Sequence, residues 1–196
     1  RFREPFVIDG RQIYASASVG IAVYPEDGGD PATLLRNADT AMYIAKSEGR
    51  NGFRYYSQSM SAQAMQRTDM VSRLQAAIER GALTLHYQPQ RDVRSGDFVG
   101  VEALVRWTDD RGEIIPPSKF IPLAEDTGLI EPLGKWVLET ACAQAMAWQR
   151  AGIDLVVAVN VSARQLRRPR FTEDVMRVLE STGLPADRLE IELTET

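Results

Sequence analysis

Two carboxylates and one side-chain amide stand at comparable places in three separate segments of the chain. The segments are residues 99–107 with Glu102, residues 155–161 with Asn160 and residues 189–194 with Glu192. Within each segment aliphatic residues recur at every second position, which is typical of a β-strand with one apolar face. Carboxylate and amide oxygens are the ligands that hard divalent cations such as Mg²⁺ or Mn²⁺ take in proteins. The pattern therefore raises the hypothesis of an oxygen-ligand metal site.

The low number of sulfur and imidazole ligands narrows this chemistry. The 196 residues include one cysteine, Cys142, and one histidine, His86. These counts exclude an intrachain disulfide and a zinc site of the usual Cys/His kind. The two residues stand in different segments, so Cys142 is expected to be a small buried side chain and not a nucleophile. The net charge of −4 disfavours a surface that coats DNA, yet it allows one small anionic ligand in a local cationic or metal-lined pocket.

Strands and helices alternate over the second part of the chain. Strands are predicted at residues 83–88, 99–107, 155–161 and 189–194, and helices at residues 117–126, 133–151 and 171–181. Such alternation is typical of βαβ units and a mostly parallel sheet, either open or closed into a barrel. In a (β/α)8 barrel helices would cover the aliphatic faces, and Glu102, Asn160 and Glu192 would point inward near the C-terminal strand ends. The alternative is an amphipathic sheet whose polar face meets water, which suits an antiparallel sheet better.

The first part of the chain has a different pattern. We expect a strand at residues 13–24, a turn-rich loop at residues 25–31, a helix at residues 32–47 and a short strand at residues 53–56. The polar residues 57–68 are interpreted as a linker that runs into a helix, which Gly81 ends. The chain begins without Met, a signal peptide or a long apolar run, so we interpret its first residues as a cut edge. Its last residues, which follow directly on a strand, are interpreted in the same way.

Five motifs in the second part resemble the EAL domain family. They are Tyr87-Gln88-Pro89, Glu102-Ala103-Leu104 within VEALVRW (residues 101–107), PSKFIPLAEDTGLI (residues 117–130), Asn160-Val161-Ser162 and Glu192-Leu193-Thr194-Glu195. They follow one another in the family's order across about 110 residues, which makes the resemblance specific. The resemblance implies an α/β fold, the first half of a (β/α)8 TIM-like barrel. It also implies a metal-dependent phosphodiesterase that acts on the bacterial signalling nucleotide cyclic di-GMP.

The resemblance implies roles for the acidic residues and the amide. Glu102, Asn160 and Glu192 match metal ligands and catalytic residues, in a site for two Mg²⁺ or Mn²⁺ ions. Glu195 matches a catalytic-site acid that fixes the loop after the next strand, and so supports the site without binding metal. Family members continue with an Asp-Asp loop and a Lys that this sequence does not reach. The chain by itself is therefore expected to be inactive.

Three further residues match positions that bind the cyclic dinucleotide. Gln88 matches a polar contact from the first strand. Leu104 and Arg106 match residues that hold the ligand, and Arg106 does so through a phosphate, with which a guanidinium forms charge-assisted hydrogen bonds.

The beginning of the chain resembles the C-terminal third of a GGDEF, or diguanylate cyclase, domain. The match rests on residues 17–24 (ASVGIAVY), 38–43 (ADTAMY), 45–46 (AK) and 49–51 (GRN). Lys46 and Arg50 match positions that reach the GTP phosphates, although a solvated cationic helix end is the simpler alternative. Gly28-Gly29-Asp30 is not the family's signature, because it follows the strand and precedes Pro31. The signature would precede residue 1, so no cyclase chemistry is expected from this chain.

Together the resemblances imply three parts. They are the C-terminal α+β part of a GGDEF domain (residues 1–57), a linker with the start of a connecting helix (residues 58–72) and the first half of an EAL domain (residues 73–196). The expected function is hydrolysis of cyclic di-GMP to linear pGpG in a cytoplasmic, homodimeric GGDEF–EAL protein, which an upstream segment could anchor to a membrane. The alternatives are a degenerate EAL domain that senses cyclic di-GMP without cutting it, and a non-catalytic regulatory or dimerisation unit.

Neither a nucleic-acid polymer nor a membrane is expected as a partner within these residues. The arginines of residues 164–170 could form a nucleic-acid patch, but a solvated loop at a helix start suits the acidic chain better.

Overall fold

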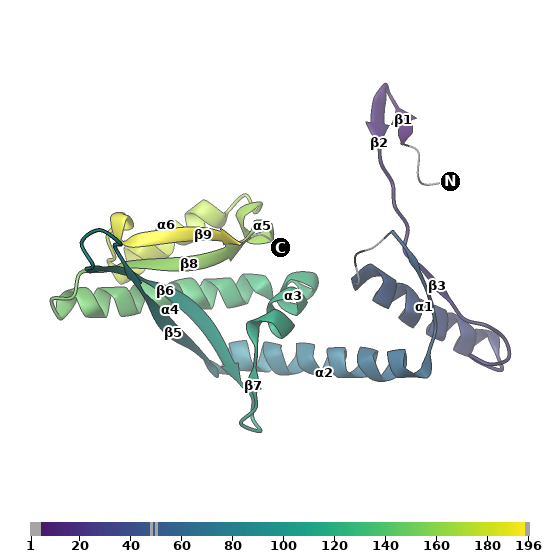
Figure 1. Ribbon diagram of the computed structural model, residues 1–196. Helices are drawn as coiled ribbons and strands as arrows, with labels where there is room; N and C mark the ends of the chain where they lie inside the picture. The colour runs from purple at the N-terminus through teal and green to yellow at the C-terminus, as the bar shows by residue number, and fades with distance from the viewer. Residues whose placement is uncertain (1–4, 48, 50, 195–196) are drawn as a thin grey trace. The chain divides into compact units, whose positions relative to one another are not determined.

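The computed structural model describes residues 5–47, 49 and 51–194. Arg50 and Glu195, to which the resemblances assign roles, lie outside these residues. The chain divides into two compact units, Arg1–Asp69 and Met70–Thr196, and the division falls within helix α2 (Gln58–Arg80), which Figure 1 labels. Within the described residues, no helix combines the length and the hydrophobicity that crossing a membrane requires.

The described part of the first unit contains two small sheets. Its elements are β1 (Phe6–Ile8), β2 (Arg11–Ile13), β3 (Val19–Ile21), α1 (Pro31–Ser47), β4 (Phe53–Tyr55) and the beginning of α2. β1 and β2 form an antiparallel hairpin, whereas β3 pairs in parallel with β4. Helix α1 packs closely on β3, since a Cβ at Gly20 would overlap the backbone of Ala38. The helix and the short strand expected in this part are confirmed as α1 and β4.

Two expectations for the first unit are wrong. The single strand expected at residues 13–24 is divided into β2 and β3, with irregular chain between them. β3 pairs with β4 over only three residues, and a strand persists only where a partner satisfies its backbone groups. The linker expected at residues 57–68 is helical, because α2 begins at Gln58. This stretch is rich in Ala, Gln and Met, which favour helix without forming an apolar stripe.

The second unit is built around one mixed sheet. Its strands are β5 (Leu83–Arg91), β6 (Phe98–Thr108), β7 (Ile114–Ile115), β8 (Val156–Ser162) and β9 (Leu189–Thr194). Their order is β5-β6-β8-β9, with β7 paired to β6. β5 runs antiparallel to β6, whereas the pairs β6–β8 and β8–β9 are parallel. The expected parallel arrangement is thus confirmed for three of the four main strands.

Helices connect the parallel strands. They are α3 (Pro117–Thr127), α4 (Ile130–Arg150), α5 (Ala163–Leu166), α6 (Phe171–Thr182) and the 3-10 turn η1 (Ala186–Arg188). Helix α3 begins with Pro117, which lacks the backbone N–H that a first helical turn leaves unpaired. It ends before Gly128, whose φ of 82° is the left-handed conformation that ends helices. α3 and α4 thus connect β6 to β8, and α5 and α6 connect β8 to β9.

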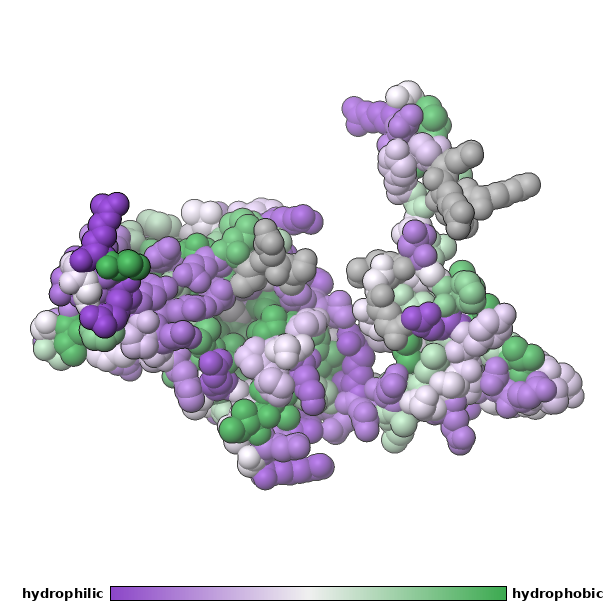
Figure 2. Space-filling view, in the orientation of Figure 1, coloured by the Kyte–Doolittle hydropathy of each residue, from purple (hydrophilic) through white to green (hydrophobic). Residues whose placement is uncertain are grey.

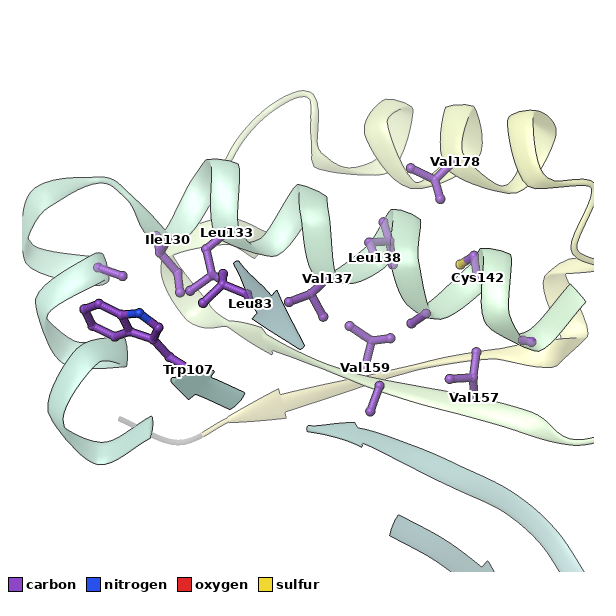
Figure 3. Close-up of a cluster of buried hydrophobic side chains, with 14 of the residues drawn as sticks. Leu83, Trp107, Ile130, Leu133, Val137, Leu138, Cys142, Val157, Val159 and Val178 are labelled. Atoms are coloured by element: carbon purple, nitrogen blue, oxygen red, sulfur yellow. The ribbon is translucent and has the colours of Figure 1, made fainter. Parts of the chain in front are cut away.

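The hydrophobic core lies between the sheet and its helices. In β6 the predicted aliphatic face is buried at Val101 and Ala103, but Val99 is 48% exposed. In β8 the predicted aliphatic face is buried there, with Val157 and Val159 at 0% and 1% exposure. Figure 3 shows these two side chains pointing toward Leu138 and Cys142 of α4, with Val178 of α6 beyond that helix. Among the described residues, 21 buried side chains form this core, which packs the strands against the helices.

Two details of the core bear on the predictions from sequence. Cys142 is fully buried, so the expectation of a small buried side chain is confirmed, and burial raises the pKa of its thiol to about 11. In β9 the aliphatic face is buried less than expected, because Ile191 is 37% and Leu193 57% exposed. Large hydrophobic side chains also lie at the surface elsewhere, among them Val93 and Ile114, and hydrophobic patches stand among hydrophilic ones in Figure 2.

Candidate active site

Strand register brings the three candidate metal ligands to neighbouring strands. Glu102 in β6 pairs with Ala158 in β8, two residues before Asn160. Asn160 in turn pairs directly with Glu192 in β9. Alternation places these polar side chains on the face opposite the buried aliphatic residues of β6 and β8. All three are half-buried, which suits polar groups at the edge of a core.

Two hydrogen bonds join polar side chains across the sheet. Nδ2 of Asn160 donates to Oε1 of Glu102 at 2.6 Å, and Nε2 of Gln90 donates to Oε1 of Glu192 at 3.5 Å. Gln90 was not singled out in the sequence. It lies two residues after Gln88 in β5, so the two side chains share a face of the strand. It stands opposite Gly100, whose missing side chain leaves room for the Gln90 side chain. The alternation of side chains along β5 was the sequence signal that could have identified Gln90.

The donor set fits a hard divalent cation. Glu102 and Glu192 contribute carboxylate oxygens, and Asn160 uses its amide nitrogen toward Glu102, so its amide oxygen is available as a third ligand. Within the described residues, no three His, Cys, Asp or Glu side chains gather closely enough to hold a metal ion. Among the described residues, the candidate ligand set is therefore two carboxylates and the Asn160 amide.

A cavity of about 290 Å³ lies beside the last paired residues of β6 and β8. Leu104, Arg106 and Asn160 line it from the strands, and α3, α4 and α5 contribute further lining residues. Nη1 of Arg106 donates to the carbonyl oxygen of Val105 at 2.9 Å, which holds this half-buried guanidinium close to its own strand. The cavity combines apolar walls with a cation, a lining that suits a ligand with apolar rings and an anionic group.

Two other candidate residues, Gln88 and Lys46, are exposed. Gln88 pairs with Glu102 across the β5–β6 ladder, but it is exposed and does not line this cavity. Lys46 is exposed near the end of α1. The structure thus brings Glu102 to Asn160, and brings Leu104 and Arg106 to one cavity with Asn160.

Comparison with models of known protein families identifies the family to which this chain belongs. The family model of the EAL domain matches residues 71–196, well over half of the chain. The chain belongs to the EAL domain family. Residues 1–52 match the model described as "Diguanylate cyclase, GGDEF domain", as the resemblance of the beginning of the chain implied.

Curated relatives match this EAL chain over its whole length. The bifunctional diguanylate cyclase/cyclic di-GMP phosphodiesterase MucR of Pseudomonas aeruginosa is 42% identical over 197 residues, which cover 100% of this chain and 29% of MucR. The cyclic di-GMP phosphodiesterase PdeR of Escherichia coli is 41% identical over 196 residues, which cover 100% of this chain and 30% of PdeR. The chain therefore spans less than a third of the length of these curated relatives.

A solved structure gives the fold of the second unit. The structure titled "PaMucR Phosphodiesterase, c-di-GMP complex" is similar with a TM-score of 0.62 and 40% sequence identity. The similarity covers 65% of this chain and 52% of the solved one. The second unit of the EAL chain is thus part of a TIM-barrel fold, and the expected fold class is confirmed.

A turn behind Arg106 fixes the end of β6 in the EAL chain. Oδ1 of Asp109 accepts hydrogen bonds from the backbone N–H groups of Glu113 at 2.8 Å and Arg111 at 2.9 Å, and its other oxygen pairs with Arg73. The Glu113 N–H, then the Arg111 N–H and the Arg73 charge, hold the pKa of Asp109 below its ordinary value of 3.8. The Asp109 side chain is 1% exposed, so this turn is held firmly.

Proposed function

We propose that this chain is part of a cyclic di-GMP phosphodiesterase that hydrolyses the cyclic dinucleotide to linear pGpG with Mg²⁺ or Mn²⁺. The observation that carries the proposal is the bond between Asn160 and Glu102 at 2.6 Å, with Glu192 in register beside Asn160. Relatives whose names state this activity share the whole length of the chain. Because the chain spans under a third of those relatives, the activity belongs to a longer protein with a complete EAL barrel.

The proposed ligands of the metal site are Glu102, Asn160 and Glu192. When bound there, divalent cations polarise a phosphate and lower the pKa of a water molecule. The chain's own contribution is to fix three oxygens on adjacent strands, so that little reorganisation accompanies binding. Glu195 follows Glu192 in sequence, and its proposed role is to support a neighbouring loop of the site.

The proposed role of Arg106 is to bind a phosphate of the dinucleotide that does not react. Its guanidinium lines the cavity with Leu104, which would contact an apolar face of the ligand. Gln88, opposite Glu102 on β5, is the proposed polar contact from the first strand. Proximity and charge pairing of this kind orient a substrate before the chemical step.

The test is an assay of the parent protein with a complete EAL domain. Purified protein is incubated with cyclic di-GMP and Mn²⁺, or with EDTA, and linear pGpG is measured by chromatography. We expect conversion with Mn²⁺ and none with EDTA. Binding of cyclic di-GMP without conversion under either condition would favour the sensor, and absence of both would contradict the proposal.

Two further expectations from the sequence are retained as proposals. The division into residues 1–57, 58–72 and 73–196 is one, with α2 as a continuous helix across the middle part. The second is that the complete protein forms a homodimer, which light scattering would detect.

A further inference from the structure

One buried amide outside the proposed ligands fixes the end of strand β8. Gln165 is 8% exposed and lies in the short helix α5. Its Oε1 accepts a hydrogen bond from the backbone N–H of Ser162 at 3.1 Å, and its own backbone N–H donates to Oγ of Ser162 at 3.3 Å. These reciprocal bonds form a capping box, which sets the direction of the chain where β8 ends and α5 begins.

The same amide rests against helix α4 at Gly134. A Cβ on Gly134 would overlap Nε2 of Gln165 and lie 3.0 Å from its Cδ. Glycine within a helix is ordinarily less stable than alanine, because it loses more conformational freedom on folding. The room that Gly134 leaves for the Gln165 amide explains why glycine stands here.

Gly134 and Gln165 also form the wall between two cavities. One is the cavity of about 290 Å³ that Arg106 and Asn160 line. The other, of about 200 Å³, lies between α4 and α6. Both cavities are lined by Gly134 and Gln165. A displacement of the Gln165 side chain therefore changes the shape of the candidate ligand cavity.

The capping box connects directly to the proposed metal ligand. Ser162 stands two residues after Asn160 in β8, and residues two apart in a strand share a face. Ser162 is 4% exposed, so a shift of its backbone cannot be absorbed by movement into solvent. Such a shift would move the Asn160 amide relative to Glu102, its partner at 2.6 Å.

We propose that Gln165, seated against Gly134, is a positioning residue that holds Asn160 in place for the divalent cation. This inference rests on the proposed function, since it assumes that Asn160 and Glu102 bind that cation. Residues that orient metal ligands in this way change metal affinity or activity by about 10- to 100-fold when replaced.

The experiment uses four forms of the parent protein besides the wild type. They are Gly134→Ala, Gln165→Ala, the double variant and Leu184→Ala, which perturbs the buried core at a residue that lines neither cavity. Mn²⁺ binding to EDTA-stripped protein is measured by calorimetry, thermal unfolding by circular dichroism and turnover by conversion of cyclic di-GMP. Leu184→Ala controls for a general loss of stability.

We expect Gly134→Ala and Gln165→Ala each to weaken Mn²⁺ binding by about 10-fold or more. Gly134→Ala should lower the Tm, because its methyl group displaces Gln165. In the Gln165→Ala background the same substitution should leave the Tm unchanged or raise it, because the overlap is gone. Leu184→Ala should lower the Tm while Mn²⁺ affinity stays at the wild-type value.

Two results would overturn the inference alone. One is a Tm raised by Gly134→Ala with unchanged Mn²⁺ affinity, as for an ordinary helical glycine. The other is wild-type Mn²⁺ affinity in Gln165→Ala, which decides the matter if Gly134→Ala does not fold. A wild-type protein that neither binds Mn²⁺ nor hydrolyses cyclic di-GMP would contradict the proposed function and the inference with it.

Discussion

Nδ2 of Asn160 lies 2.6 Å from Oε1 of Glu102, although the two residues are 58 positions apart in the sequence. The bond joins neighbouring parallel strands through side chains, close to where the backbone ladder between β6 and β8 ends. Since the amide nitrogen donates to Glu102, the amide oxygen is the Asn160 atom that can accept or bind a cation. A carboxylate and an amide are thus held together on neighbouring strands.

The first prediction concerns Glu102. In the parent protein, Glu102→Ala should reduce the turnover of cyclic di-GMP by more than about 100-fold, beyond the loss typical of residues that only orient ligands. The fold should persist, because removal of a half-buried acid leaves no unpaired buried charge. Glu180→Ala, an exposed acid on α6, is the matched control and should retain activity. Unchanged Mn²⁺ binding by calorimetry in Glu102→Ala would show that the metal assignment is wrong.

The second prediction concerns Arg106. Arg106→Ala should weaken cyclic di-GMP binding by about 10- to 100-fold even in EDTA, because a charge-assisted bond to phosphate contributes about 1.5–3 kcal/mol. The dissociation constant is measured by calorimetry. Arg94→Ala, an exposed arginine in the β5–β6 turn, is the control and should bind as the wild type does. An unaltered constant in Arg106→Ala would mean that the guanidinium serves only its contact with Val105.

The alternation of aliphatic and polar residues within each strand allowed the positions of the site residues to be predicted from the sequence. In β6 and β8 the aliphatic residues on either side of Glu102 and Asn160 are buried, so the opposite orientation of these two polar side chains could be predicted from the sequence. The motif order then indicated the EAL family, which the comparisons confirm. The roles of Glu102, Asn160 and Glu192 in catalysis remain predictions.

Contacts between distant segments could not be predicted in the same way. The bond from Gln90 to Glu192 depends on strand register and on the missing side chain of Gly100. The contact of Gln165 with Gly134 depends on the depth at which α4 packs. Both contacts depend on tertiary neighbours, which periodicity does not encode. The first turns of helix α2 were missed for a different reason, because their helix-forming residues make no apolar stripe.

The third prediction concerns the pH dependence of stability. The folded pKa of Asp109 is lowered, first by the Glu113 N–H and then by Arg111 and Arg73. The stabilisation is therefore fully present above the ordinary value of 3.8 and is lost as the pH falls through the lower folded pKa. Asp109→Asn should lower the urea midpoint of the EAL domain at pH 7, and the difference from the wild type should shrink below pH 3.8.

Asp110→Asn is the control for this measurement, because the neighbouring carboxylate is exposed. It should leave the urea midpoint unchanged at pH 7. An Asp109→Asn midpoint that equals the wild type at pH 7 would show that the charge does not stabilise the turn after β6.

The last prediction concerns the 196 residues expressed alone. They should not hydrolyse cyclic di-GMP, because the part of them that matches the solved phosphodiesterase structure covers only 52% of that chain. A closed (β/α)8 barrel needs eight strands, and β9 already leaves Ile191 and Leu193 partly exposed. Exposed apolar side chains on a strand favour association, so light scattering should detect oligomers or aggregates. A monomer with a cooperative thermal transition and Mn²⁺-dependent turnover would contradict this prediction, since it would require a complete site within these residues.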